Sequence, residues 1–168
     1  MSNYQGIEEN SMLNGDGVRT VFWFSGCGHK CKGCHNPHTW NPKSGNPITD
    51  EVVDELLSTL RHDWVSGVTI SGGDGLMPYN IDTTISICKR IREELPHSTI
   101  WIYSGDTYEA IIKDAKKLEV VTLCDVLVDG RFEIDKLDTS LCWRGSTNQR
   151  VINLKESLAQ NQVILHCK

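Results

Sequence analysis

Short runs of apolar residues, each ending in glycine and polar residues, recur along the chain and predict buried strands. Four of them stand out: Val18–Phe24, Gly67–Ser71, Thr99–Tyr103 and Asp125–Val128. Val151–Leu154 is a candidate fifth strand and Val163–Leu165 a short late one. Residues 1–17 end in a turn-rich segment and predict no regular element.

Between these runs, apolar residues recur at intervals of three and four, which is typical of amphipathic helices. The first stripe follows Thr49, a good cap with acidic residues behind it. The second begins at Ile81 and stops at Pro96. The third follows Asp106, which with Glu109 resembles a capping box.

Strands that alternate with helices predict βαβ units and a parallel sheet. We expect an α/β fold, a partial and laterally open (β/α) barrel of about five parallel strands, because five strands are too few for an ordinary closed barrel. At 168 residues the chain is expected to form a single domain, residues 1–168. The C-terminal tail, residues 155–168, matches no pattern.

Composition and charge narrow the class of protein. The hydrophobic fraction of 39% and charged fraction of 23% are ordinary for a soluble globular protein. A net charge of −5 argues against a nucleic-acid partner. There is no apolar run long enough to span a membrane and no apolar signal-peptide core near the start. We therefore expect a cytoplasmic protein without a membrane partner.

A loop of residues 25–40 contains three of the seven cysteines, and it is the strongest chemical signal. Cys27, Cys31 and Cys34 are separated by three and then two residues, so their thiolates can converge on one metal centre. Three thiolates leave one iron of a four-iron cube open, as in reactive metal sites. A structural zinc site completed by His29, His35 or His38 is the alternative on spacing alone.

Polar, glycine-containing turns follow four successive predicted strands. They read Ser-Gly-Cys, Gly-Gly-Asp, Ser-Gly-Asp and Asp-Gly-Arg. Because the carboxyl ends of parallel strands meet at one edge, we expect all four turns on one rim. An enzyme that binds a polar cofactor beside its metal needs such a rim, whereas a zinc knuckle does not.

Five segments together carry a family resemblance from about residue 15 to residue 154. They are Asn14-Gly-Asp-Gly-Val-Arg-Thr20, the Cys-x3-Cys-x2-Cys loop, Ser71-Gly-Gly-Asp74, Leu127-Val-Asp-Gly-Arg-Phe132 and Trp143-Arg-Gly-Ser-Thr-Asn-Gln149. The chain resembles the radical S-adenosylmethionine enzymes and, within them, the activating proteins of anaerobic ribonucleotide reductase. It departs from that family at Gly75, where proline is usual, and at His35, where tyrosine is frequent.

The resemblance implies two cofactors. Cys27, Cys31 and Cys34 would bind a 4Fe-4S cluster whose remaining iron chelates S-adenosyl-L-methionine. The residues implied to bind that cofactor are Gly33, Cys34, His35, Gly72, Gly73, Asp74, Ser104 and Asp129, with Arg144 and Asn148 as further rim residues. Gly73 would let the methionine amino group approach closely, because it has no side chain.

The resemblance also implies the reaction and its partners. The reduced cluster would pass an electron to the sulfonium, and the resulting 5′-deoxyadenosyl radical would take a hydrogen atom from a backbone glycine. That glycine lies in the catalytic subunit of the reductase. His29, Lys30 and Lys32 make the cysteine loop locally basic in an acidic protein, which favours docking of an acidic flavodoxin-type electron donor there. A pyruvate formate-lyase-type activase and a zinc-binding interaction module remain alternatives. Cys124, Cys142 and Cys167 receive no role.

Overall fold

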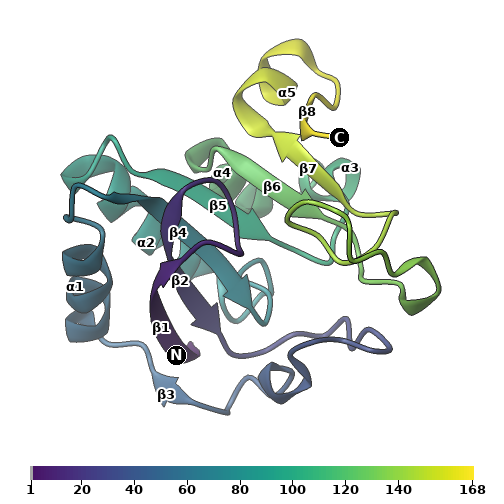
Figure 1. Ribbon diagram of the computed structural model, residues 1–168. Helices are drawn as coiled ribbons and strands as arrows, with labels where there is room; N and C mark the ends of the chain where they lie inside the picture. Colours follow the sequence, from purple (N-terminus) through teal and green to yellow (C-terminus); the bar gives the residue numbers. More distant parts are fainter. Residues whose placement is uncertain (1) are drawn as a thin grey trace.

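The computed structural model describes residues 2–168 and contains an eight-stranded sheet with helices against one side (Figure 1). The strands are β1 Asn3–Ser11, β2 Val18–Phe24, β3 Asn46–Pro47, β4 Val65–Gly72, β5 Thr99–Tyr103, β6 Val126–Asp129, β7 Arg150–Asn153 and β8 Leu165–Cys167. The α-helices are α1 Asp50–Thr59, α2 Ile81–Glu94, α3 Tyr108–Ile111, α4 Ala115–Leu123 and α5 Leu154–Gln160, with short 3-10 turns η1 Pro37–Thr39 and η2 Ile134–Lys136.

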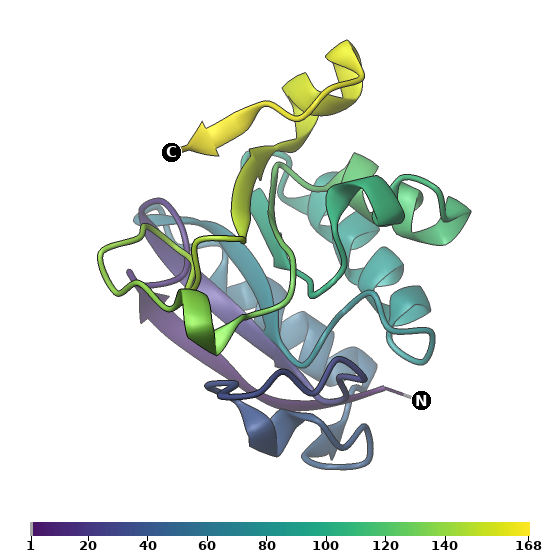
Figure 2. The same ribbon diagram turned by 90° about the vertical axis from the view of Figure 1, so that its right-hand side faces the viewer.

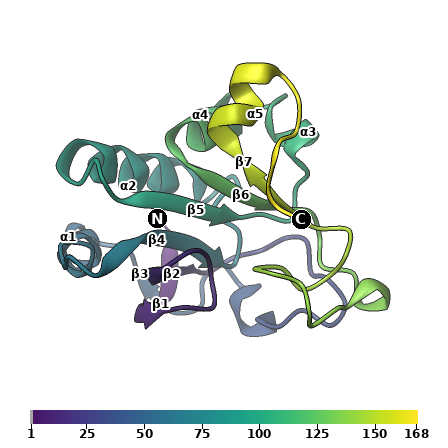
Figure 3. The same ribbon diagram turned by 45° about the horizontal axis from the view of Figure 1, so that its top comes forward.

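The sheet is mixed, with strand order β3-β1-β2-β4-β5-β6-β7-β8. Only β2, β4, β5 and β6 are mutually parallel. The expectation of about five parallel strands was wrong, because β7 pairs with β6 antiparallel. The segment between β6 and β7 contains no crossover α-helix of the kind that returns a chain for parallel pairing. The order has two ends, β3 and β8, as an open sheet requires (Figure 3).

The two ends of the chain also differ from the expectation. Residues 3–11, for which no element was predicted, form β1 and pair antiparallel with β2. Most of these residues are polar and partly exposed, so the strand lacks an apolar run. The late strand lies at residues 165–167 instead of 163–165, and it pairs antiparallel with β7.

Two helices follow the predicted stripes, the third stripe is divided, and α5 lies in the tail for which no element was predicted and begins at Leu154, which was assigned to a strand. Thr49 caps α1 by accepting a hydrogen bond from the amide of Val52. The third stripe is divided between α3 and α4, and Asp106 caps neither of them. Thr107 caps α3 and Asp114 caps α4, because each side chain accepts from an amide three residues on.

The sheet has two differently packed faces. The helices cover one face, and the main core there includes Phe22, Ile70 and Leu127, all fully buried. The β1–β2 turn and the segment between β6 and β7 lie on the other side (Figure 2). A smaller cluster around Trp101 and Val128 occupies that second face. Along residues 2–168, every helix is too short or too polar to cross a membrane.

Arg19, from the first matched segment, is fully buried on the second face. Its guanidinium donates to the hydroxyls of Thr69 and Thr99 and to three backbone carbonyls. It also lies over the Trp101 ring, 5.4 Å from the centroid. Burial lowers its pKa to about 10. All its donors are satisfied by neutral groups, and these bonds link β2 to β4 and β5.

Candidate metal and cofactor site

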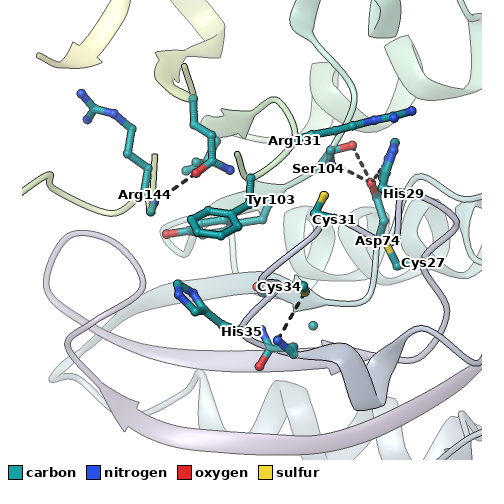
Figure 4. Close-up of a pocket in the computed structure, with 18 of the residues that line it drawn as sticks. Cys27, His29, Cys31, Cys34, His35, Asp74, Tyr103, Ser104, Arg131 and Arg144 are labelled. Carbon is teal, nitrogen blue, oxygen red and sulfur yellow. Dashed lines mark hydrogen bonds and ion pairs between the residues drawn. The ribbon is translucent and has the colours of Figure 1, made fainter. Parts of the chain in front are cut away.

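A cavity of about 380 Å³ opens at the carboxyl ends of the four parallel strands (Figure 4). Cys27 after β2, Gly73 after β4, Ser104 after β5 and Gly130 after β6 all contribute to its wall. The expectation that four polar turns share one rim is confirmed by the parallel pairing of these strands. Cavities of this size are typical of small-molecule sites.

The cysteine loop is closed at its base by backbone hydrogen bonds. The amide of Gly26 donates to the carbonyl of Thr39, and that of Cys27 donates to the carbonyl of Trp40 at 3.1 Å. Gly26 and Gly33 have φ angles of +99° and +77°, which favour glycine. The chain therefore leaves and returns to the same point, and the residues between form a compact loop beside the cavity.

All three predicted cluster ligands line this cavity. Figure 4 shows Cys27, Cys31 and Cys34 around it, on three sides of the same space. Burial raises the pKa of the Cys27 thiol to about 11. The amide of Asn36 donates to the sulfur of Cys34 at 3.3 Å, the kind of bond that tunes an iron–sulfur centre.

The donor set fits a cluster better than a single ion. Among residues 2–168 there is no group of three or more His, Cys, Asp or Glu side chains placed to hold one metal ion. Two of the histidines weighed for a zinc site are engaged elsewhere, His29 with Asp74 and His35 against Phe132. In a 4Fe-4S cluster each thiolate binds a different iron, so the thiols surround a volume and need not meet at one point.

Asp74 joins three of the rim turns. Its side chain is almost fully buried, with the residue 1% exposed. Oδ2 accepts from the Ser104 hydroxyl at 2.8 Å, from the Gly105 amide at 3.0 Å and from His29 Nε2 at 3.1 Å. Oδ1 accepts from the Leu76 amide at 2.8 Å. The carboxylate predicted to bind cofactor is thus engaged by the protein, as is the hydroxyl of Ser104.

The glycines of the β4 turn have a packing role beside the predicted one. Gly72 and Gly73 line the cavity with backbone atoms alone. A Cβ atom at Gly73 would collide with the carbonyl of Gly26, at the base of the cysteine loop. The Gly73 amide donates to the carbonyl of Phe24 at 2.8 Å. The turn can approach the loop this closely only without a side chain.

Gly33 and His35 lie at the outer part of the loop. The His35 ring lines the cavity and packs against Phe132, with ring centroids 5.1 Å apart. Gly33 is exposed and is not part of the cavity wall, and a Cβ atom there would press on Ile134. The structure therefore brings His35 to the cavity and leaves Gly33 beside it.

Asp129 is placed away from the other predicted cofactor residues. Its carboxylate accepts from Arg150 at 2.6 Å and from the amide of Tyr108 at 2.8 Å. It lies in a neighbouring pocket together with Asn148. Arg144 lines the main cavity, and its Nη1 donates to the carbonyl of Cys142.

Sequence reasoning missed several residues of the site, among them His29 and Tyr103. His29 was weighed only as a zinc ligand or a basic group, yet its buried ring binds Asp74. Tyr103 lines the cavity and donates its hydroxyl to the carbonyl of Trp143 at 2.6 Å. Burial raises the pKa of Tyr103, so the phenol stays protonated as that donor. No spacing rule connects either residue to its partner.

Known proteins resemble this chain over most of its length. The family described as "4Fe-4S single cluster domain" matches residues 13–152. A relative from Escherichia coli K12, named anaerobic ribonucleoside-triphosphate reductase-activating protein, is 39% identical over 155 residues, covering 91% of this chain and 99% of that protein. Relatives of the same name from Enterobacteria phage T4 and Haemophilus influenzae are 38% and 34% identical, covering 89% and 91% of this chain and 92% and 99% of theirs.

Proposed function

The chain belongs to the family of anaerobic ribonucleoside-triphosphate reductase-activating proteins and contains a 4Fe-4S single cluster domain, and from this premise we propose that it activates an anaerobic ribonucleotide reductase by reductive cleavage of S-adenosyl-L-methionine. The observation that carries the proposal is the placement of three thiols from one loop around a cavity where four parallel strands end. An iron–sulfur cube held at three corners suits that donor set.

Cys27, Cys31 and Cys34 would bind three irons of the cluster, and the fourth iron would chelate the cofactor's methionine group. When bound, the cluster would supply the one-electron reduction for cleavage of S-adenosyl-L-methionine, and the proposed outcome is a glycyl radical on the reductase. The protein's contribution is to bind, orient and shield these groups.

The residues of the cavity would bind and orient the cofactor mainly through backbone atoms and a few side chains. Gly72 and Gly73 present only backbone to the cofactor, so its amino group can approach the turn. Asp74 would hold the turns at fixed separation through its hydrogen bonds to the protein. His35 and Phe132 offer ring surfaces on which the adenine can pack.

Apolar residues at the edge of the cavity would contact the reductase. Leu13, at the turn between β1 and β2, is 83% exposed and still lines the cavity. Leu141 and Trp143, from the segment between β6 and β7, line it as well. An incoming glycine-containing loop would bury these side chains, which gives the activase a preference for a polypeptide substrate.

The electron would enter from the outer side of the cysteine loop. Lys30 and Lys32 are exposed on that loop in a protein of net charge −5. We propose that an acidic flavodoxin-type donor docks there and that the protein acts in the cytoplasm, where reducing conditions keep cysteines from forming disulfides. Charge reversal at both lysines should then lower the reduction rate and its dependence on salt.

The decisive test is anaerobic reconstitution of the full chain with iron and sulfide. Reduced protein should produce 5′-deoxyadenosine from S-adenosyl-L-methionine and a glycyl radical signal on added reductase. Cys31→Ala should abolish both products, whereas Cys142→Ala, at an exposed cysteine outside the cavity wall, should retain both.

Two results would overturn this function. A colourless protein with stoichiometric zinc would leave only an interaction module. Cofactor cleavage that yields a radical on a pyruvate formate-lyase-like protein and none on the reductase would assign a different partner.

A further inference from the structure

His29 lies between Cys27 and Cys31 in the sequence and lines the same cavity, and its ring contacts Asp74. The ring is 6% exposed, and Nε2 is 3.1 Å from Asp74 Oδ2 and 3.7 Å from Asp106 Oδ1 (Figure 4). The ring lies so close to Gly105 that a Cβ atom there would collide with it. The ring is therefore held between the turns that follow β4 and β5.

The groups that receive His29 are themselves tied to the fold. Asp74 Oδ2 also accepts from Ser104 and Gly105, and Asp106 forms an ion pair with Lys117 of α4 at 2.6 Å. Nε2 must carry a proton to donate to the carboxylate, whether the ring is neutral or charged. A neutral ring therefore makes this contact only as the tautomer that carries its proton on Nε2.

The rest of the loop has little else to hold it. Within the described chain, residues 28–33 make no other hydrogen bond or ion pair to residues outside 27–34. The segment includes Gly28 and Gly33, and Lys30 has a φ of +47°. A loop of this composition has high conformational entropy unless a side chain anchors it.

We propose that His29 is a positioning residue, which fixes the cysteine loop to the β4 and β5 turns and so sets the separation of the three thiols. The proposal rests on the proposed function only in taking those thiols as cluster ligands. The anchor itself is made entirely by groups of the protein. Hydrogen-bonding partners outside the ligand shell typically change metal affinity by about 10- to 100-fold.

The first experiment compares His29→Ala with His38→Ala, an exposed histidine of the same loop. In reconstituted full-length protein, loss of iron to a ferrous chelator should be about tenfold faster for His29→Ala than for wild type. After removal of the cluster, trypsin should cut at Lys30 and Lys32 about tenfold faster. His38→Ala should match the wild type in both measurements. Far-ultraviolet circular dichroism checks that each variant is folded.

A second variant disturbs the anchor from the other side. Gly105→Ala keeps His29 but places a Cβ atom where the ring lies, at a backbone conformation that alanine tolerates. It should reproduce the faster tryptic cleavage. In the His29→Ala background the same substitution should have no further effect, because the ring it displaces is gone. This non-additivity is specific to the proposed contact.

A conservative replacement separates positioning from general stability. His29→Gln retains a donor that can reach Asp74, so it should recover most of the slow iron loss. The electron paramagnetic resonance signal of the reduced cluster should change on addition of S-adenosyl-L-methionine in His29→Gln as in wild type, and less in His29→Ala.

Equal cleavage and iron-loss rates for His29→Ala and His38→Ala would overturn the proposal, as would additive effects of Gly105→Ala and His29→Ala. A wild-type protein that takes up no iron would instead refute the proposed function. The proteolysis and the double-mutant comparison would still decide the role of His29 in that case.

Discussion

The turns after β4 and β6 begin alike and are used differently. Each places an aspartate next to a glycine at the carboxyl end of a parallel strand, and both aspartates are 1% exposed. Asp74 binds groups from three turns around the cavity. Asp129 binds Arg150 and the first amide of α3, in a neighbouring pocket. Of the two, only Asp74 lines the main cavity.

Strand alternation explains the difference. Asp129 is the last residue of β6, and successive side chains of a strand point to opposite faces. Val128 faces the cavity, so Asp129 faces the helices, where it meets the start of α3. Asp74 lies two residues beyond β4, after Gly72 has turned the chain with a φ of +90°. The position of a carboxylate relative to the end of its strand thus decides whether it faces the cavity or the helices.

The sharpest test of this contrast, and the largest expected effect, is Asp74→Ala. The change leaves the Ser104 hydroxyl, the Gly105 and Leu76 amides and His29 without their acceptor. Several buried hydrogen-bond donors left without an acceptor should lower the free energy of unfolding by about 3 kcal/mol or more. Denaturant unfolding measures this loss, and iron content after reconstitution should fall with it.

Asp129→Ala should have a smaller effect, confined to stability. The Tyr108 amide loses its acceptor, while Arg150 keeps its pairing with the exposed Glu109. We expect a loss of about 2 kcal/mol in denaturant unfolding. Iron content after reconstitution should equal that of wild type. If this variant lost the cluster and Asp74→Ala kept it, the two aspartates would have the opposite roles.

The smallest effect is expected from Glu109→Gln, at the outer end of the Asp129 network. The hydrogen bond from Arg150 lowers the pKa of Glu109 in the folded protein. In acid, the unfolded chain therefore binds more protons than the folded protein. The pair's contribution to the free energy of unfolding is present above pH 4.5 and is lost as the pH falls through the lowered pKa of Glu109. For this exposed pair we expect about 0.5 kcal/mol at pH 7. The difference in the free energy of unfolding should be larger at pH 7 than at pH 3.

Much of the fold was predictable because apolar runs and stripes report burial directly. The bounds of β2 and β5 agree with the predicted strands, and Thr49 caps the predicted first helix. Strand direction was not predictable for β7, since an apolar run reads the same in parallel and antiparallel pairing. The strand β1 was missed because an edge strand with polar, half-exposed residues has no such run.

The site, too, was predictable from the sequence only in part. Cysteine spacing and four polar turns sufficed to predict that thiols and glycines share one rim, because parallel strands align their carboxyl ends. The partner of His29 could not be predicted, because Asp74 is 45 residues away in sequence and on a different turn. Asp129 continues the alternation of β6, whose end was predicted one residue early, and this places its carboxylate on the helix side.

The contacts at the base of the cysteine loop limit whether the loop can be transferred to another protein and keep its shape. Thr39 and Trp40 close it, Asn80 holds the carbonyl of Ser25, and the Asp74 amide holds that of Gly26. An engineer who grafted the eleven residues from Ser25 to His35 onto another scaffold would transfer the thiols without the contacts that shape them. A minimal transplant has to include the end of β4 and its turn.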